Sequence, residues 1–259
     1  MMATPTPRKI TISKSQRITP SVQRIWFAGD DLSTFPSVSP GAYIKLMFDL
    51  QGNPATPVSD LQHVAMRTYT VNHFDSNKQE LSIDMVIHAD NGITGPASAW
   101  ATIAKPGDSI MIAGPGQSKP LSREYDWVLF AGDMTALPSI RNYLSSLPSN
   151  AKGFAVIAVA DETDIVVCEK PVGVEIIWAT EASLPAALDS LQWLSGTPAV
   201  WVACEFSDMR AIRKWLKDEK LVPHHQVYIS SYWKKGRSED QHKIDKRQDS
   251  DTYLKSLTA

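Results

Sequence analysis

The sequence is poor in cysteine, has no long apolar run and carries no excess of positive charge. Cys168 and Cys204 are the only cysteines among 259 residues, and their spacing favours neither a disulfide framework nor a zinc site. No stretch approaches the ~20 consecutive apolar residues of a membrane helix, and the first residues lack the apolar run of an export signal. The net charge of −2 argues against a nucleic-acid-binding protein, which normally needs a basic face. We therefore expect a cytoplasmic globular protein without membrane insertion.

The first half of the chain has the pattern of an antiparallel β-barrel. Short runs that alternate between apolar and polar residues are separated by loops rich in proline, glycine and asparagine. One helical segment, expected at 97–104, interrupts this pattern. The predicted strands cover residues 9–13, 21–29, 42–48, 68–74, 80–88 and 109–114.

From Trp127 onward, apolar runs alternate with helical patterns, which indicates a parallel sheet covered by helices. We therefore predict a two-domain fold, with an antiparallel β-barrel at 8–118 and an α/β doubly wound, nucleotide-binding domain at 126–233. Residues 234–259 are expected to form a charged, helical C-terminal extension. The strands of the second domain are predicted at 127–132, 153–160, 174–179, 199–204 and 226–230, and its helices at 135–147, 183–194 and 207–219.

Four consecutive residues of a predicted strand, Arg67-Thr68-Tyr69-Thr70 (the tetrad), supply a cation, a phenol and two hydroxyls. Because side chains alternate along a strand, Arg67 and Tyr69 should share one face and the two threonines the other. A guanidinium matches phosphate oxygens, a tyrosine can stack on a ring system and a small hydroxyl can approach a ring nitrogen. The tetrad could therefore bind an anionic cofactor with an aromatic ring system. Taken alone, it is more simply explained as an ordinary strand with one exposed arginine.

Two strand ends of the second half carry residues suited to a nucleotide, since parallel sheets bind ligands beyond the carboxyl ends of their strands. Gly132 lets the backbone approach a ligand, Thr135 can cap the next helix, and the helix amides can face a phosphate. Glu205 could orient a nicotinamide or a ribose, while Ser207 or Asp208 could cap the helix that follows. An ordinary strand-to-helix turn and an exposed carboxylate are the alternatives, because neither a GxGxxG nor a Walker motif is present.

The segment from His88 to Ser98 leads from a predicted strand into the helix of the barrel half. Gly95 and Pro96 permit a tight turn, and the amides of Ala97 and Ser98 would point at a pyrophosphate placed before the helix. The hydroxyl of Ser98 can add a contact. An uncommitted loop with a helix cap is the alternative interpretation.

In this order, these segments resemble the siderophore-interacting protein family, whose members are FAD-containing ferric-siderophore reductases of the ferredoxin–NADP reductase-like superfamily. The match runs from about residue 8 to residue 247 and depends on IDMVIHADNG, GPASAWA, KPGDSIMIAGPG, AGDMTALPSI and SYWKKGRSE. The resemblance implies a monomeric enzyme in which NAD(P)H, or ferredoxin, reduces a ferric siderophore through FAD and Fe(II) is released. A flavoprotein reductase of another acceptor and a non-catalytic siderophore-binding module remain the alternatives.

The resemblance also implies roles for individual residues. Arg67 would pair with the FAD phosphates, Tyr69 would lie against the flavin and Thr70 would approach its N5 atom. The flavin itself performs the redox chemistry, so no side chain need act as an acid or a base. The residues implied to contact FAD are Arg67, Thr68, Tyr69, Thr70, Asp84, Val86, His88, Gly95, Ala97, Ser98 and Trp233. Those implied to bind the nicotinamide nucleotide are Gly132, Asp133, Thr135 and Glu205.

Positive charge is concentrated at the C-terminus, where residues 234–255 carry seven Lys/Arg and five Asp/Glu. Lys234, Lys235 and Arg237 are predicted to attract an anionic ferric chelate. A solvated terminal helix capped by Ser238, with Glu239 and Asp240 in its first turn, is the simpler interpretation of most of these charges. No histidine has partners at metal-ligand spacing, so no protein-bound metal is expected.

Three positions depart from the family pattern. Asn72 stands where several members carry a basic residue, which would weaken one phosphate contact or leave it to another group. Met134 replaces an acidic residue and Cys204 a frequent glycine in the predicted nucleotide site. These two changes leave the choice among NADPH, NADH and ferredoxin open.

Overall fold

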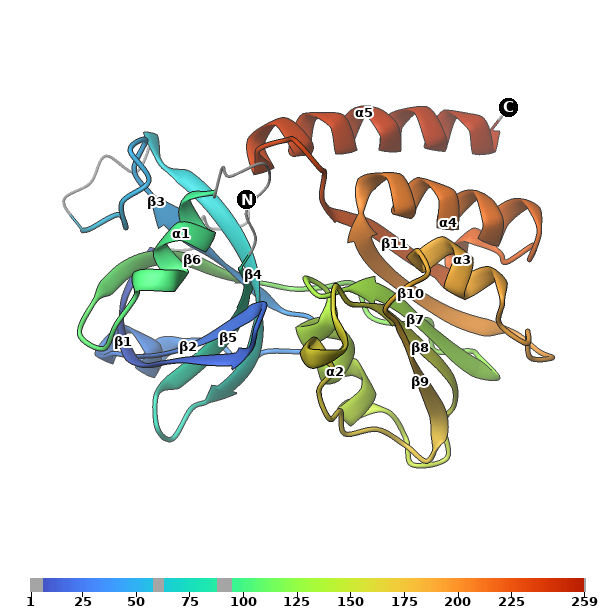
Figure 1. Ribbon diagram of the computed structural model, residues 1–259, viewed down its shortest axis with the longest axis horizontal. Helices are drawn as coiled ribbons and strands as arrows, with labels where there is room; N and C mark the ends of the chain where they lie inside the picture. Colours follow the sequence, from blue (N-terminus) through green and yellow to red (C-terminus); the bar gives the residue numbers. More distant parts are fainter. Residues whose placement is uncertain (1–6, 58–62, 88–94, 259) are drawn as a thin grey trace.

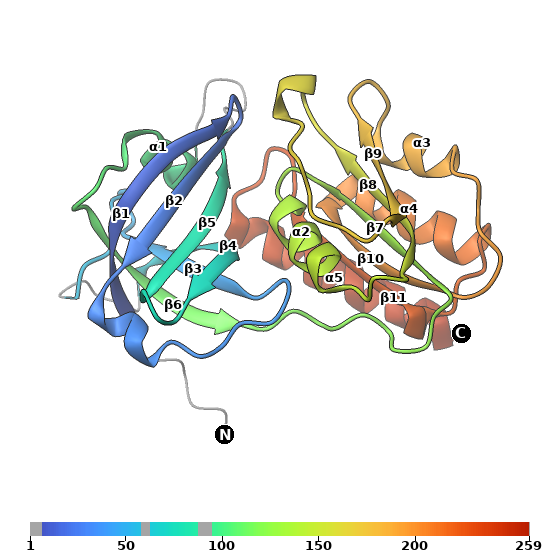
Figure 2. The ribbon, with the colours of Figure 1, turned by 90° about the horizontal axis from the view of Figure 1, so that it is seen from below.

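The computed structural model describes residues 7–57, 63–87 and 95–258. Figure 1 shows a β-barrel beside a helix-covered sheet, with the C-terminal helix running along the sheet and beginning near the barrel. Figure 2 gives the same arrangement after a quarter turn. Within the described residues, no helix is both long and apolar enough to cross a membrane.

The N-terminal domain consists of β1 (Arg8–Thr19), β2 (Val22–Ala28), β3 (Tyr43–Phe48), β4 (Ala65–Asp75), β5 (Glu80–Val86), β6 (Ser109–Gly116), α1 (Pro96–Ile103) and the short helix η1 (Asp30–Thr34). Its strands form a closed antiparallel barrel in the order β1-β2-β5-β4-β3-β6. Alternate apolar side chains such as Ile10 and Ile44 fill the interior. Trp100 of α1 packs against Phe27 and Phe48, and α1 thereby covers part of the barrel core.

The C-terminal domain consists of β7 (Trp127–Asp133), α2 (Leu137–Ser146), β8 (Lys152–Ala158), η3 (Glu162–Asp164), β9 (Gly173–Ala179), α3 (Leu184–Asp189), β10 (Pro198–Glu205), α4 (Phe206–Asp218), η4 (His224–Gln226), β11 (Val227–Trp233) and α5 (Glu239–Thr258). Its five strands are parallel, in the order β11-β10-β7-β8-β9. Apolar side chains of α3 and α4 pack on one face of the sheet and those of α2 on the other. The predicted fold class, a barrel followed by a doubly wound parallel sheet, is confirmed.

The helix predicted at 183–194 is wrong in its second half, because α3 ends at Asp189. Ser190 closes the helix by donating its hydroxyl to the carbonyl of Ala187 at 2.8 Å. Trp193 leaves the helical path and packs edge-on against Trp127, with ring centroids 4.8 Å apart. Tertiary packing of this large ring therefore overrides the local helical preference.

The two domains are joined by buried polar contacts as well as by apolar packing. The hydroxyls of Thr70 in β4 and Ser139 in α2 lie 2.9 Å apart and are buried. Asn142 of α2 donates to a backbone carbonyl of β4 at 2.8 Å. The fully buried Asp164 accepts a 2.6 Å hydrogen bond from the hydroxyl of Thr19. These contacts bring the tetrad against the start of the second domain.

Candidate functional site

The tetrad lies in β4, between the barrel core and the second domain. As the alternation predicts, Thr68 and Thr70 share the face that turns away from the barrel: Thr68 contacts the first turn of α5, and Thr70 contacts α2. Tyr69, on the other face, packs against the barrel core, and burial raises the pKa of its phenol. This phenol therefore stays protonated and is a hydrogen-bond donor.

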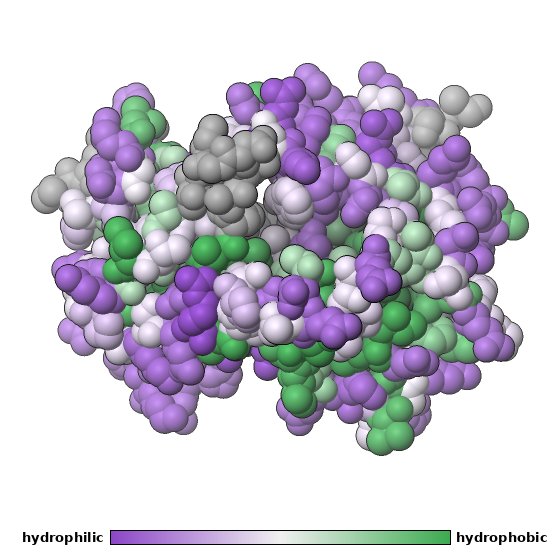
Figure 3. All heavy atoms as spheres, in the orientation of Figure 1, coloured by the Kyte–Doolittle hydropathy of each residue, from purple (hydrophilic) through white to green (hydrophobic). Residues whose placement is uncertain are grey.

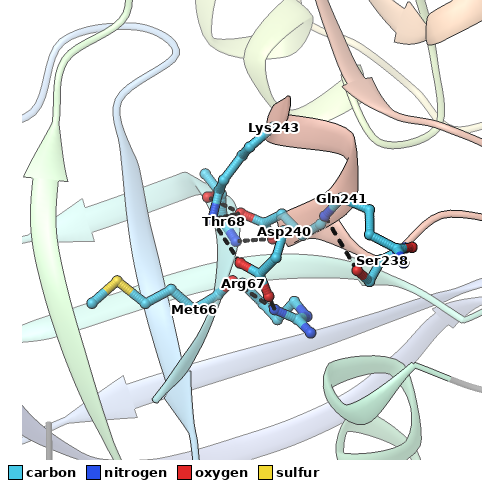
Figure 4. A network of polar contacts seen from close by, with 8 residues as sticks. Met66, Arg67, Thr68, Ser238, Asp240, Gln241 and Lys243 are labelled. Carbon is cyan, nitrogen blue, oxygen red and sulfur yellow. Dashed lines mark hydrogen bonds and ion pairs between the residues drawn. The ribbon is translucent and has the colours of Figure 1, made fainter. Parts of the chain in front are cut away.

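Arg67 presents a guanidinium at the surface of the domain boundary. Its side chain is 15% exposed, and its Nη1 lies 3.5 Å from the Oδ2 of Asp240 in α5. The same Nη1 donates to the carbonyl of Met66 at 2.9 Å. Figure 4 shows the first turn of α5 seated directly on this part of β4. The cation that the sequence predicts for phosphate binding is thus held beside a carboxylate.

The first turn of α5 makes further contacts with the tetrad that the sequence did not predict. Glu239 accepts from the backbone amide of Thr68 at 3.2 Å and from its hydroxyl at 3.0 Å. The predicted cap is confirmed, because the Ser238 hydroxyl and the Gln241 side chain exchange hydrogen bonds with each other's backbone amides. Glu239 and Asp240 therefore lie in the first turn of the helix and also contact β4.

Buried polar groups hold α5 against β11. The Nε2 of His242, a buried side chain, lies 2.8 Å from the hydroxyl of Ser231. Lys246 donates to the hydroxyl of Ser230 at 2.6 Å, and burial lowers the pKa of both His242 and Lys246. The outer surface over α5 is mainly hydrophilic (Figure 3). No apolar stripe in the sequence could have indicated this docking, because polar side chains make it.

Three of the residues predicted to bind FAD, Gly95, Ala97 and Ser98, lie at the start of α1. Ala97 and Ser98 are buried in the first turn of α1, whose N-cap is Gly95 and has no side-chain capping bond. Gly95 has a φ of −63°, and a Cβ added there would meet none of the described residues within 4 Å, so the φ angle does not require glycine at this turn. His88 lies outside the described residues.

Two further residues predicted to contact FAD lie in β5. Asp84 forms a two-bond ion pair with Arg24 of β2, with distances of 2.5 and 2.7 Å, and this pairing raises the pKa of Arg24. Asp84 therefore has a structural partner within the barrel. Val86 packs against the apolar cluster on the α2 face of the sheet. It thus lies at the domain boundary.

The residues predicted for the nucleotide gather at the carboxyl ends of β7 and β10, where the strand order reverses. A Cβ on Gly132 would lie 2.7 Å from the carbonyl oxygen of Ala203 and 2.6 Å from the Cβ of Ala136, so only glycine fits here. Such a reversal point is where open α/β sheets bind ligands. Asp133 and Glu205 flank it at the ends of the two strands.

Asp133 connects this turn to the predicted flavin neighbour Trp233. Its Oδ2 accepts from the indole Nε1 of Trp233 at 2.8 Å. Its Oδ1 accepts from the amide and the hydroxyl of Thr135, at 2.9 and 2.5 Å. Burial raises the pKa of Asp133. The carboxylate therefore fixes the Trp233 ring at the end of β11.

Two predicted helix caps are wrong. The hydroxyl of Thr135 is bound to Asp133, and α2 begins only after Ala136, without a side-chain cap. Glu205 itself caps α4: its Oε2 accepts from the amides of Ser207 and, at 3.4 Å, Asp208. Its Oε1 accepts from the amide of Lys235 at 3.2 Å. At α4, a carboxylate therefore satisfies the orphan amides that a nearby hydroxyl was predicted to cap.

The three cations predicted to meet the substrate differ in their surroundings. Lys234 forms a 2.7 Å ion pair with Asp245, and Arg237 lies 3.4 Å from the same carboxylate. These neighbours lower the pKa of Asp245. Lys235 is exposed, and its ammonium has no ion-pair partner within 7–57, 63–87 and 95–258. The side chain of Lys235 is therefore open to an anionic ligand, while its backbone amide binds Glu205.

Comparison with known proteins gives matches along almost the whole chain. The model described as "siderophore-interacting FAD-binding domain" matches residues 11–119, and the model described as "siderophore-interacting protein" matches residues 125–236. The ferric vibriobactin reductase ViuB of Vibrio cholerae is 30% identical over 251 residues, covering 90% of this chain and 92% of ViuB. The NADPH-dependent ferric-chelate reductase of Escherichia coli is 27% identical over 240 residues, covering 87% and 92%. The crystal structure of the siderophore-interacting protein SipS from Aeromonas hydrophila superposes with a TM-score of 0.83 at 28% identity, covering 95% of this chain and 99% of SipS.

Proposed function

Because the chain belongs to the siderophore-interacting protein family, we propose that it reduces ferric siderophores and releases Fe(II), taking electrons from NAD(P)H through bound FAD. The observation that carries the proposal is the contact between Thr70 and Ser139, which brings the tetrad to the reversal point of the sheet. A cofactor held by the barrel and a donor held by the sheet would then meet at one boundary. The protein would act as a monomer in the cytoplasm.

The residues at this boundary fit an FAD. Arg67 offers a guanidinium whose fork matches phosphate oxygens, and α1 begins at Gly95 and Pro96 with its first turn, which includes Ala97 and Ser98, predicted to face the pyrophosphate. The Gly132 turn has the close backbone packing expected where a nucleotide approaches a sheet edge. When bound, the flavin converts a two-electron hydride donor into a one-electron reductant for Fe(III).

The side chains of the site would bind and orient the reactants. Asp133 holds the indole of Trp233 at the end of β11, where it can limit access of water to the flavin edge. Thr70, tied to Ser139, places a hydroxyl at the boundary itself. Reduction favours iron release because Fe(II) matches the hard oxygen ligands of a siderophore less well than Fe(III) does.

Lys235 is the cation best placed to meet an anionic chelate first. It is exposed, whereas Lys234 and Arg237 share Asp245. Those two would contribute if the chelate displaced the carboxylate. We propose that all three bind the substrate beside the flavin, with Lys235 making the largest contribution.

The first turn of α5 should compete with FAD for Arg67. Replacing Asp240 by asparagine removes the anion that lies 3.5 Å from the guanidinium, so the affinity for FAD is expected to rise by up to about fivefold. The effect is small because the Asp240 side chain is 62% exposed. Titration of FAD into apoprotein measures it. Asp251→Asn, at an exposed position further along the same helix, is the control, and equal affinities of the two variants would contradict the competition.

The proposed function is tested by anaerobic spectroscopy of the FAD-loaded protein. NADH, NADPH and a reduced ferredoxin are each added, and the flavin absorbance is expected to bleach with a nicotinamide nucleotide. A ferric hydroxamate and a ferric catecholate are then added, and at least one should restore the absorbance. Bleaching without reoxidation by either chelate would indicate a reductase of another acceptor. Failure to bind FAD would indicate a non-catalytic binding module.

A further inference from the structure

The second domain is strongly acidic where its nucleotide would lie. Residues 124–209 contain three Lys/Arg against twelve Asp/Glu, although the whole chain has a net charge of only −2. Asp133, at the end of β7, is in register with Ala158 and Ala179, at the ends of β8 and β9. The turns that follow β8 and β9 therefore lie at the same edge of the sheet as Asp133 (Figure 2).

None of the three cations in this region is placed at that edge. Lys152 is the first residue of β8, and Lys170 precedes the first residue of β9, so both belong to the opposite edge. Arg141 lies in the middle of α2. The turns at the carboxyl edge, at residues 159–163 and 180–183, contain Asp161, Glu162 and Glu181 and no Lys or Arg.

Two of these carboxylates are directed to solvent. Asp161 is engaged within its own turn, where it accepts from the amide and the hydroxyl of Thr163 at 2.8 and 2.6 Å. Glu162 and Glu181 are exposed. The turn that carries Glu162 is held in place by Asp164, whose Oδ1 accepts from barrel residues including Thr19. Glu162 is therefore part of an anchored turn.

NADPH carries a 2′-phosphate that NADH lacks. This phosphate has a charge of about −1.5 to −2 at neutral pH. In doubly wound sheets, a carboxylate at the end of a strand beside the phosphate-binding turn suits the ribose hydroxyls of NADH, whereas an arginine accommodates the 2′-phosphate. Resting on the proposed function, we propose that the electron donor is NADH and that Glu162 and Glu181 exclude the 2′-phosphate of NADPH. The chain would differ in this respect from the NADPH-dependent relative of Escherichia coli.

The test compares ADP with 2′,5′-ADP, which differ only by the phosphate in question. Isothermal titration of the FAD-loaded protein is expected to give a Kd for ADP at least about tenfold lower than for 2′,5′-ADP. The double variant E162K/E181K should lower this preference by about tenfold or more, and the kcat/KM ratio of NADH to NADPH should shift in the same direction. Glu175→Lys reverses one carboxylate, half the charge change of the double variant, at an exposed position towards the opposite end of β9, and should leave both ratios unchanged.

Equal or tighter binding of 2′,5′-ADP by the unmodified protein would overturn the inference. The inference would also be overturned by a folded double variant whose Kd and kcat/KM ratios equal those of Glu175→Lys. The unfolding midpoint shows whether the double variant is folded. If the protein bound neither ADP nor 2′,5′-ADP, both the inference and the proposed donor site would be wrong. The reductase proposal is tested separately: if ADP is preferred but no ferric chelate reoxidises the flavin, the donor inference stands and the proposed substrate is wrong.

Discussion

Replacing Arg67 by alanine is expected to weaken FAD binding by roughly 10- to 100-fold. A hydrogen bond to a charged group contributes about 1.5–3 kcal/mol, and about 1.4 kcal/mol corresponds to a factor of ten in Kd. The Arg67 side chain is only 15% exposed, so its interaction with a phosphate would be screened less than that of a surface lysine. Fluorescence titration of FAD into apoprotein measures the change.

Two further variants make the Arg67 result specific. Arg67→Lys keeps the charge but loses the planar fork, so its affinity should fall between those of the alanine variant and the unmodified protein. Arg17→Ala removes an exposed arginine from β1 of the same barrel and should leave FAD binding unchanged. A folded Arg67→Ala protein that binds FAD within about twofold of the unmodified protein would show that the phosphates are anchored elsewhere.

Gly132→Ala is expected to lower the free energy of unfolding by about 1–3 kcal/mol, as overpacking of a filled site usually does. The added Cβ would meet the backbone oxygen of Ala203 at 2.7 Å, and two central strands would have to separate to relieve the contact. The same displacement would move the ends of β7 and β10. Urea unfolding gives the stability, and the Kd for ADP should rise with it.

Gly95→Ala provides a matched control for this prediction. Its new Cβ would meet no atom of residues 7–57, 63–87 and 95–258 within 4 Å, and the φ of −63° is one that other residues adopt readily. The variant should therefore change the free energy of unfolding by less than about 1 kcal/mol, because the lower entropy of the unfolded chain opposes the weaker capping by alanine. If the two variants had the same unfolding free energy, the close packing at Gly132 would not be what requires glycine there.

The fold could be predicted from the sequence because its two periodicities are local. Alternation of apolar and polar residues indicated the barrel strands, and apolar runs separated by helical patterns indicated the parallel sheet. The predicted strands of both domains agree with the observed ones to within a few residues at most ends. β1 is the exception, since it continues to Thr19 where the prediction ended at residue 13.

The missed features depend on partners distant in sequence or on competition between neighbouring groups. Glu239 binds Thr68 across 171 residues, and no local pattern encodes that contact. Asp133 lies only two residues from Thr135, but whether the Thr135 hydroxyl caps α2 or binds Asp133 depends on the exact start of the helix. Whether Glu205 or a later residue caps α4 likewise depends on the residue at which that helix begins. The sequence indicated the local cap at Ser238, but it did not indicate the partners of Glu239, Asp133 and Glu205.

The most direct test of the account is the yield of Fe(II) when the reduced FAD-loaded protein meets a ferric siderophore without oxygen. Each reduced flavin carries two electrons and each Fe(III) takes one, so we predict about two Fe(II) per flavin, trapped by a ferrous chelator as the flavin absorbance returns. A flavin that stays reduced, with no Fe(II) formed from any ferric siderophore, would contradict the account.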